Sequence, residues 1–346
     1  MSKIKTLFRW FPLAAASLII AVFTHYYISL FVPPGSSTTP VVIEFEPGAS
    51  FNRIAKVLKE KGIIRDINAF VLLARLRGST KKARAGEYEF NVSMLPVRVL
   101  EKMEKGLVIK HPVTIPEGYN LREIADLLER EGLSKKELFI DRVSDKVFLS
   151  SMGVSSPSAE GFLFPDTYQF SKGMTEEAMI KSMVSRFMEV FTDKMESRGQ
   201  EMGMSVKDVV TLASMVEKET GEASERPRIA GVFLNRIKMG IPLQSDPTVI
   251  YGIKGFNGNL TKKDLLTETP YNTYRKRGLP EGPIANPGVD SIKAVLYPEE
   301  GNYLYFVSKN DGTHHFSRTL LEHNRAVYKY QLKKQDSKST TETRRR

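Results

Sequence analysis

An uncharged apolar run near the N-terminus limits the folds open to this chain more than any other feature. Residues Trp10–Val32 include no Lys, Arg, Asp or Glu, and a helix of that length, at ~1.5 Å per residue, spans the ~30 Å hydrocarbon core of a bilayer. Lys3, Lys5 and Arg9 precede the run, whereas the next basic residue is Arg53. The positive-inside rule therefore predicts a cytoplasmic N-terminus, residues 1–9, and an extracytoplasmic remainder.

A cleaved signal peptide is the alternative interpretation of this run. The run is longer than the ~7–15 apolar residues of a signal peptide, and no small-residue cleavage site follows it. We therefore expect a retained single-pass helix over residues 10–32 in the cell (inner) membrane, with the bulk of the chain on the periplasmic side. Residues 33–41, rich in Pro, Gly, Ser and Thr, are predicted to be a linker.

Composition narrows the chemistry and the partners. The chain has no cysteine, which excludes disulfides and thiolate metal sites, and its five histidines show no zinc-like spacing. We expect neither a metal nor a cofactor. The formal net charge of +11 lies partly in a basic tail, residues 333–346, predicted to be disordered. A basic exported protein suits anionic lipid headgroups or an anionic wall polymer, and nucleic acid is not expected as a partner.

The N-terminal half contains an internal repeat. The segment from Pro47 matches the segment from Pro116 once one residue is allowed for in the turn, and Ile54, Ala55, Leu58 and Gly62 then recur at Ile124, Ala125, Leu128 and Gly132. Each copy predicts a strand, a glycine turn and an amphipathic helix that ends at glycine. The pattern resembles LysM-type glycan-binding units, and a strand with Tyr88 and Phe90 would complete the first one. A support domain without glycan contact is the alternative for this α/β region, residues 42–150.

Residues Ser205–Gly221, SVKDVVTLASMVEKETG, predict a helix with a carboxylate on its apolar face. Ser205 and Asp208 form a capping-box pattern, and Gly221 is a plausible stop. At ~100° per residue, Glu217 falls roughly 20° from Val206, inside the apolar arc. Loss of solvation favours the protonated form of such a carboxyl, so Glu217 is a candidate general acid. A structural ion pair or a loop cap is the competing interpretation.

Four motifs in the C-terminal half, residues 151–332, combine turn residues with polar and aromatic side chains. They are EGFLFPDTY from Glu160, LASMVEKETG, LQSDPTVIYG from Leu243, and YNTYRKRGLPEGPIANPG from Tyr271. Sugars need donors and acceptors for their hydroxyls and rings for their apolar faces, so these loops predict a carbohydrate groove. The candidate substrate-binding residues are Glu160, Tyr168, Gln244, Asp246, Tyr251, Tyr271, Asn272, Thr273, Tyr274 and Asn286.

In their order along the chain, these four motifs resemble those of the endolytic murein transglycosylases, the YceG-like or MltG family. The resemblance runs from the apolar segment to about Tyr330. It implies a membrane-anchored α+β enzyme that cleaves the β-1,4 bond between N-acetylmuramic acid and N-acetylglucosamine within nascent peptidoglycan. It also implies a 1,6-anhydromuramyl product, an end to strand elongation, and partners among the penicillin-binding proteins and other wall-synthesis enzymes.

The resemblance also implies that Glu217 is the catalytic acid. A lytic transglycosylase needs no second carboxylate, because the muramyl C6 hydroxyl attacks its own C1, whereas ordinary glycosidases pair two carboxylates. Two other functions stay open: a non-catalytic scaffold that binds glycan strands, and a muramidase that hydrolyses the same bond with Glu217 paired to Glu160 or Asp246.

Overall fold

The computed structural model of the chain describes residues 2–332, and the predicted basic tail, residues 333–346, lies outside them. The fold is mixed α+β, as the sequence predicts. The chain divides into two compact units, Met1–Pro112 with Gln169–Met174, and Val113–Tyr168 with Thr175–Arg346. The part of the second repeat copy from Pro116 onward lies in the second unit, and the domain boundary at residue 150 stays a prediction.

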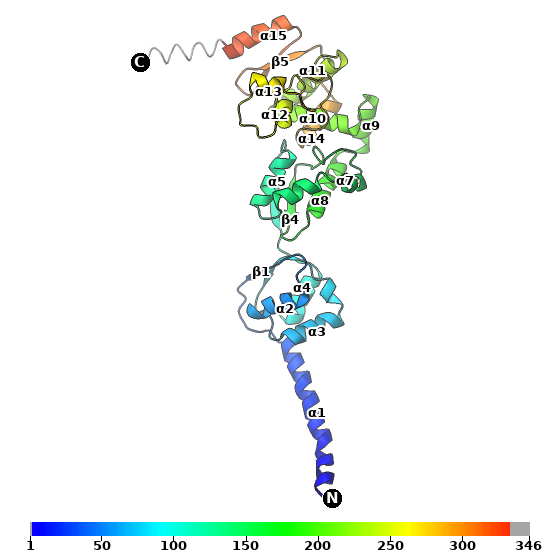
Figure 1. Cartoon of the computed structure of the whole chain (residues 1–346), viewed down its shortest axis with the longest axis vertical. Coiled ribbons are helices and arrows are strands. Elements are labelled where there is room, and N and C mark those ends of the chain that lie inside the picture. Colours follow the sequence, from blue (N-terminus) through cyan, green and yellow to red (C-terminus); the bar gives the residue numbers. More distant parts are fainter. Residues whose placement is uncertain (1, 333–346) are drawn as a thin grey trace, which may run out of the picture. The chain divides into compact units, whose positions relative to one another are not determined.

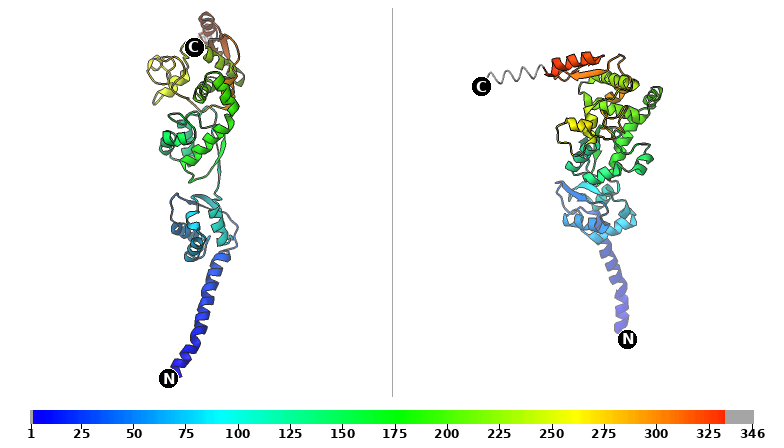
Figure 2. Two further views of the ribbon diagram at one scale, coloured as in Figure 1. Left: turned by 90° about the vertical axis from the view of Figure 1, so that its right-hand side faces the viewer. Right: turned by 45° about the horizontal axis from the view of Figure 1, so that its top comes forward.

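The first unit consists of one long helix and a small α/β core (Figure 1). Its elements are α1 (Ser2–Phe31), β1 (Val41–Phe45), α2 (Phe51–Glu60), α3 (Ile67–Leu76), η1 (Ser79–Lys81), β2 (Gly86–Phe90) and α4 (Pro96–Glu104). Strands β1 and β2 pair antiparallel, with Ile43 opposite Tyr88. Their inward side chains, together with Phe70 and Leu100, form one apolar cluster. Helix α1 is continuous in the views of Figure 2.

The second unit is mostly helical. Its elements are α5 (Leu121–Arg130), α6 (Lys136–Arg142), α7 (Lys146–Ser151), α8 (Glu176–Val190), α9 (Asp193–Glu201), α10 (Val206–Glu219), η2 (Ala223–Glu225), α11 (Arg226–Lys238), α12 (Asp246–Gly252), α13 (Lys262–Leu266), α14 (Val289–Leu296), β5 (Tyr305–Ser308), β6 (His314–Ser317), α15 (Leu320–Val327) and η3 (Tyr328–Leu332). Strands β3 (His111–Thr114) and β4 (Thr167–Phe170) pair with each other. Strands β5 and β6 form an antiparallel hairpin, against which α15 packs.

The predicted repeat is confirmed as two copies of strand, turn and helix. Helix α2 follows β1 through Gly48, and α5 follows β3 through Gly118, both glycines having positive φ, +79° and +77°. A residue with a Cβ rarely adopts that conformation, which explains the glycine in each turn. The three matched apolar positions of each helix are buried in both copies.

Helix α10 lies at the centre of the second unit, packed on α11 and α14 (Figure 1). The capping box predicted at Ser205 and Asp208 is present in both directions. The helix ends at Glu219, two residues before the predicted stop at Gly221, and Thr220 is already extended (φ −144°). Every residue from Val209 to Val216 is buried, so α10 is enclosed on all sides rather than along a single stripe.

Candidate active site

Two glutamates in the last turn of α10 lie in different surroundings. Residues two positions apart on a helix point ~200° away from each other, so Glu217 and Glu219 leave α10 on opposite sides. Because the buried segment of α10 ends at Val216, both carboxyls start at the edge of the core.

Glu217 forms a buried ion pair with Arg226. Its side chain is 6% exposed, and Arg226 Nη2 donates to Oε1 at 3.0 Å. The backbone N–H of Gly288 donates to Oε2 at 2.9 Å. Each carboxylate oxygen thus already accepts a hydrogen bond from the protein, one of them from a cation. This geometry corresponds to the competing interpretation of the helix pattern, and the catalytic role of Glu217 stays a prediction.

A third acidic residue, Glu117, packs beside this pair. Its Oε2 lies 3.7 Å from Arg226 Nη2, and its carboxylate so crowds Gly288 that a Cβ there would meet Oε1 at 2.0 Å. Burial, followed by the charge of Glu217, raises the pKa of Glu117. Arg226 is therefore shared by two carboxylates that approach each other from different elements.

Glu219 opens into a polar cavity. The cavity has a volume of about 390 Å³ and is lined by Glu219, Arg236, Leu243, Gln244, Asp246, Tyr274, Phe306, Val307, Ser308, His314, His323, Val327 and Gln331. Ser245 Oγ donates to Glu219 Oε1 at 2.5 Å. Burial, opposed by this hydrogen bond and reinforced by the charge of Asp246, raises the pKa of Glu219 from 4.5 to about 7. Glu219 is thus a carboxyl that holds a proton near neutral pH and borders a space for a ligand.

Three of the predicted substrate-binding residues line the same cavity. Gln244 has a φ of 53°, which is uncommon for a residue other than glycine and is associated with functional sites. Tyr274 Oη donates to Asp246 Oδ1 at 2.6 Å. Arg236 donates to the carbonyls of Pro242, Leu243 and Leu304, which fixes the loop that carries Gln244. The cavity therefore offers an amide, a carboxylate and aromatic rings on a rigid frame.

Glu160, Tyr251 and Asn286 form a separate buried cluster. Glu160 accepts hydrogen bonds from Leu121 N (3.1 Å), Tyr251 Oη (2.8 Å) and Asn286 Nδ2 (3.2 Å). Burial, opposed by the first two of these bonds, raises its pKa to about 7. The ring of Tyr271 meets that of Tyr251 edge-on at 4.7 Å between centroids. None of these four residues lines the cavity of Glu219, and the cluster joins α5, α12 and the loop before α14.

The other predicted residues hold loops in place. Asn272 is fully buried and donates to the carbonyls of Leu265 and Thr267. Thr273 accepts from Ser245 N through Oγ1, and its carbonyl accepts from Gln244 N. Tyr168 is buried, and its hydroxyl donates to the carbonyl of Phe164 at 2.5 Å. Asn272 and Thr273 thus position the cavity wall, and Tyr168 belongs to the core.

The candidate set from the sequence omits Glu219, Arg236 and His314. Glu219 lies in the same motif as Glu217, and the helical spacing, which puts it outside the centre of the apolar arc, does not signal its burial. His314 lies between Thr313 and His315 in the GTHHFS segment from Gly312, and this short segment carries no distinctive pattern.

Comparisons with known proteins agree on one family. The sequence model of the YceG-like family matches residues 43–329. A Bacillus subtilis protein named endolytic murein transglycosylase is 34% identical over 85% of this chain and 86% of its own length. A Streptococcus pneumoniae protein of the same name is 29% identical over 88% of this chain, which spans 61% of that relative. The crystal structure of a YceG-like protein from Listeria monocytogenes has a TM-score of 0.58 and 34% identity, covering 84% of this chain and 100% of its own.

Proposed function

The chain belongs to the YceG-like family, and from that premise we propose that it is an endolytic murein transglycosylase. The proposed reaction cleaves the β-1,4 bond between N-acetylmuramic acid and N-acetylglucosamine within nascent glycan strands and leaves 1,6-anhydromuramyl ends. Cleavage within new strands would end their elongation. The names of the relatives support the general activity, and the chemistry of the Glu219 cavity supports the finer assignment.

The observation that carries this proposal is a buried carboxyl that borders a polar cavity of about 390 Å³. Glu219 has a pKa of about 7, within the range in which a group both holds and releases a proton efficiently at neutral pH. Asp246, Gln244 and Tyr274 offer hydrogen-bonding groups and a ring in the same cavity, as sugar recognition requires.

We therefore assign the acid role to Glu219 in place of Glu217. Protonated Glu219 donates to the leaving glycosidic oxygen as the C1–O bond breaks, and the muramyl C6 hydroxyl attacks C1 to close the anhydro ring. No water takes part, so no second carboxylate is needed to activate one. Glu217, bound to Arg226 and Gly288 N, has the structural role of fixing the end of α10.

Helix α1 is proposed to anchor the enzyme in the cell (inner) membrane. Phe11–Phe31 is long and apolar enough to cross a bilayer, and apolar side chains along it, including Leu18, Ile19 and Phe23, are exposed. Lys3, Lys5 and Arg9 precede the span Phe11–Phe31. By the positive-inside rule, they support a cytoplasmic N-terminus and a periplasmic catalytic unit. Penicillin-binding proteins and other wall-synthesis enzymes are proposed partners, and the repeat units are proposed to contact glycan strands.

A muramidase is the second candidate function, because Asp246 lines the same cavity as Glu219 and its charge raises the pKa of Glu219. Two carboxyls in one cavity are also the arrangement with which hydrolases activate water.

One product analysis separates these functions. The full-length protein in detergent is incubated with uncrosslinked glycan strands, and the fragments are identified by mass spectrometry. The proposal predicts fragments with 1,6-anhydromuramyl ends. Reducing ends would replace it with hydrolysis, and strand binding without cleavage would leave a glycan-binding scaffold.

A further inference from the structure

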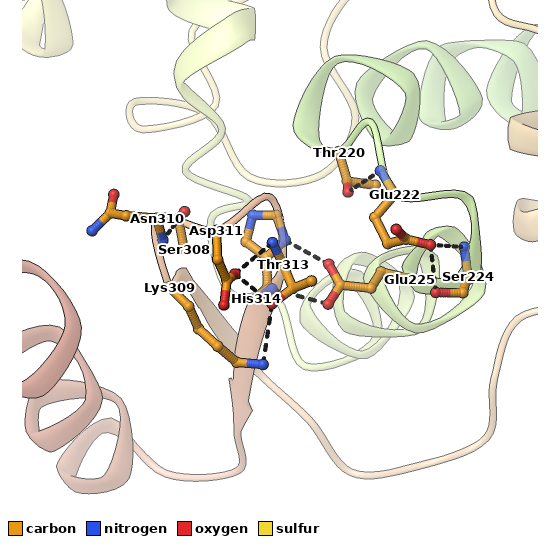
Figure 3. A network of polar contacts seen from close by, with 10 residues as sticks. All are labelled: Thr220, Glu222, Ser224, Glu225, Ser308, Lys309, Asn310, Asp311, Thr313 and His314. Carbon is orange, nitrogen blue, oxygen red and sulfur yellow. Dashed lines mark hydrogen bonds and ion pairs between the residues drawn. The ribbon is translucent and has the colours of Figure 1, made fainter.

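A histidine–glutamate pair borders the cavity of Glu219 and is not used by the mechanism above. His314 Nδ1 lies 2.7 Å from Glu225 Oε2, and the backbone N–H of His314 donates to Glu225 Oε1 at 2.9 Å (Figure 3). Both side chains are 11% exposed. A carboxylate that accepts from the backbone and from the ring holds the imidazole in one orientation, with the proton on Nδ1.

Local packing reinforces that orientation. His314 begins β6, opposite Ser308 of β5. Its ring meets that of Phe306 edge-on, with 5.5 Å between centroids. Among residues 2–332, no hydrogen bond reaches Nε2, and His314 is part of the cavity wall that includes Glu219. The unpaired nitrogen of an imidazole whose other nitrogen is bound to a carboxylate is the usual arrangement of a general base.

The charged and titratable groups around His314 belong to five elements. Glu225 ends η2, Glu219 ends α10, and Asp246 begins α12. Arg228 and Arg236 come from α11, which packs against β5, and His323 of α15 lines the same cavity. Within the part of the chain that the structure describes, residues 2–332, only Glu225 is in hydrogen-bond contact with the ring of His314.

We propose that His314, oriented by Glu225, is the general base of the transglycosylase reaction and that Glu219 is its acid. This proposal rests on the proposed function. The C6–OH proton passes to His314 Nε2 while O6 forms its bond to C1. The C1–O bond to the departing sugar breaks with its electron pair on oxygen, which takes the proton of Glu219. The site is left with an imidazolium and a carboxylate, and return of one proton from His314 to Glu219 restores both groups.

Two substitutions test the role of His314, and both keep a hydrogen-bonding side chain at position 314. His314→Asn keeps a side-chain donor for Glu225 and removes the base. Glu225→Gln keeps the size of the side chain but supplies one amide oxygen to the two donors that now share the carboxylate. The amide N–H then faces Nδ1 and moves the ring proton to Nε2, which also removes the base. His315→Asn is the matched control, because alternate residues of a strand face opposite sides and His315 does not line the cavity.

The assay is the release of anhydro fragments from uncrosslinked glycan by the full-length protein in detergent, measured against pH. We expect His314→Asn and Glu225→Gln to lower kcat about 100-fold or more with KM changed less than about twofold. A base must be unprotonated and an acid protonated, so the wild type should lose activity at both low and high pH. His314→Asn should lose the low-pH decline and keep the high-pH one. Thermal melting checks that each variant is folded.

The result that overturns the proposal is wild-type kcat with the wild-type pH profile in folded His314→Asn, or in folded Glu225→Gln if His314→Asn does not fold. That outcome leaves Glu219 as both acid and base and the proposed function intact. The proposed function fails separately, if the wild type itself releases no anhydro fragments.

Discussion

Glu160 makes the stability of the second unit depend on pH in a direction opposite to that of most carboxylates. Its pKa is about 7 in the folded protein against an ordinary value of 4.5. Below pH 4.5 Glu160 is protonated in both the folded and the unfolded protein, so its titration does not change the free energy of unfolding. Between the two values the unfolded chain ionises first, so stability falls as pH rises and levels off above about 7. The difference of about 2.5 between the pKa values corresponds to about 3 kcal/mol.

The measurement is urea unfolding of the wild type and Glu160→Gln, followed by far-ultraviolet circular dichroism from about pH 4 to about pH 8. The sequence has one tryptophan, Trp10, and it belongs to the first unit, so circular dichroism is chosen in place of tryptophan fluorescence. We expect the stability of the wild type relative to Glu160→Gln to fall by about 3 kcal/mol across that range. Parallel curves would mean that Glu160 titrates alike in both states, which would refute the buried-carboxyl argument.

Three further predictions follow from named contacts. Asp246→Asn removes a charge that raises the pKa of Glu219, so the high-pH decline in cleavage rate should move to lower pH; an unchanged profile contradicts this. Gly161→Ala places a Cβ 2.6 Å from Pro283 and Val210, so it should lower the free energy of unfolding in urea by about 3 kcal/mol. Gly132→Ala is the control, because the Cβ there meets open space, and it should lower the free energy of unfolding by about 1 kcal/mol. Arg226→Leu leaves the buried Glu217 without its cation and should lower stability by about 3–5 kcal/mol, visible as an earlier thermal transition; an unchanged transition would show that the ion pair is dispensable.

Features that depend on residues close together in the sequence could be predicted from the sequence. The capping box of α10 requires only Ser205 and Asp208, three positions apart. The repeat follows from glycine turns and from apolar spacing within each helix, and both copies fold as expected. The apolar run forms a single helix for the same reason, since its length and composition are local properties.

The site depends on contacts that a single helix pattern does not contain. Arg226 and Gly288 reach Glu217 from 9 and 71 positions away, and no periodicity within Ser205–Gly221 predicts either contact. Because α10 is buried on all sides, the apolar arc also fails to separate Glu217 from Glu219. Burial beside a cavity and the nearby charge of Asp246, which distinguish Glu219, appear only in the folded chain.

The most direct test of the account compares Glu219→Gln with Glu217→Gln in the release of 1,6-anhydromuramyl fragments from uncrosslinked glycan. The substitutions are chemically identical and two residues apart, and each keeps the shape of the side chain. We predict that Glu219→Gln lowers the rate at least about 100-fold, whereas Glu217→Gln, once its fold is verified by thermal melting, still cleaves. Loss of cleavage in a folded Glu217→Gln variant, with activity retained in Glu219→Gln, would contradict the assignment of the acid.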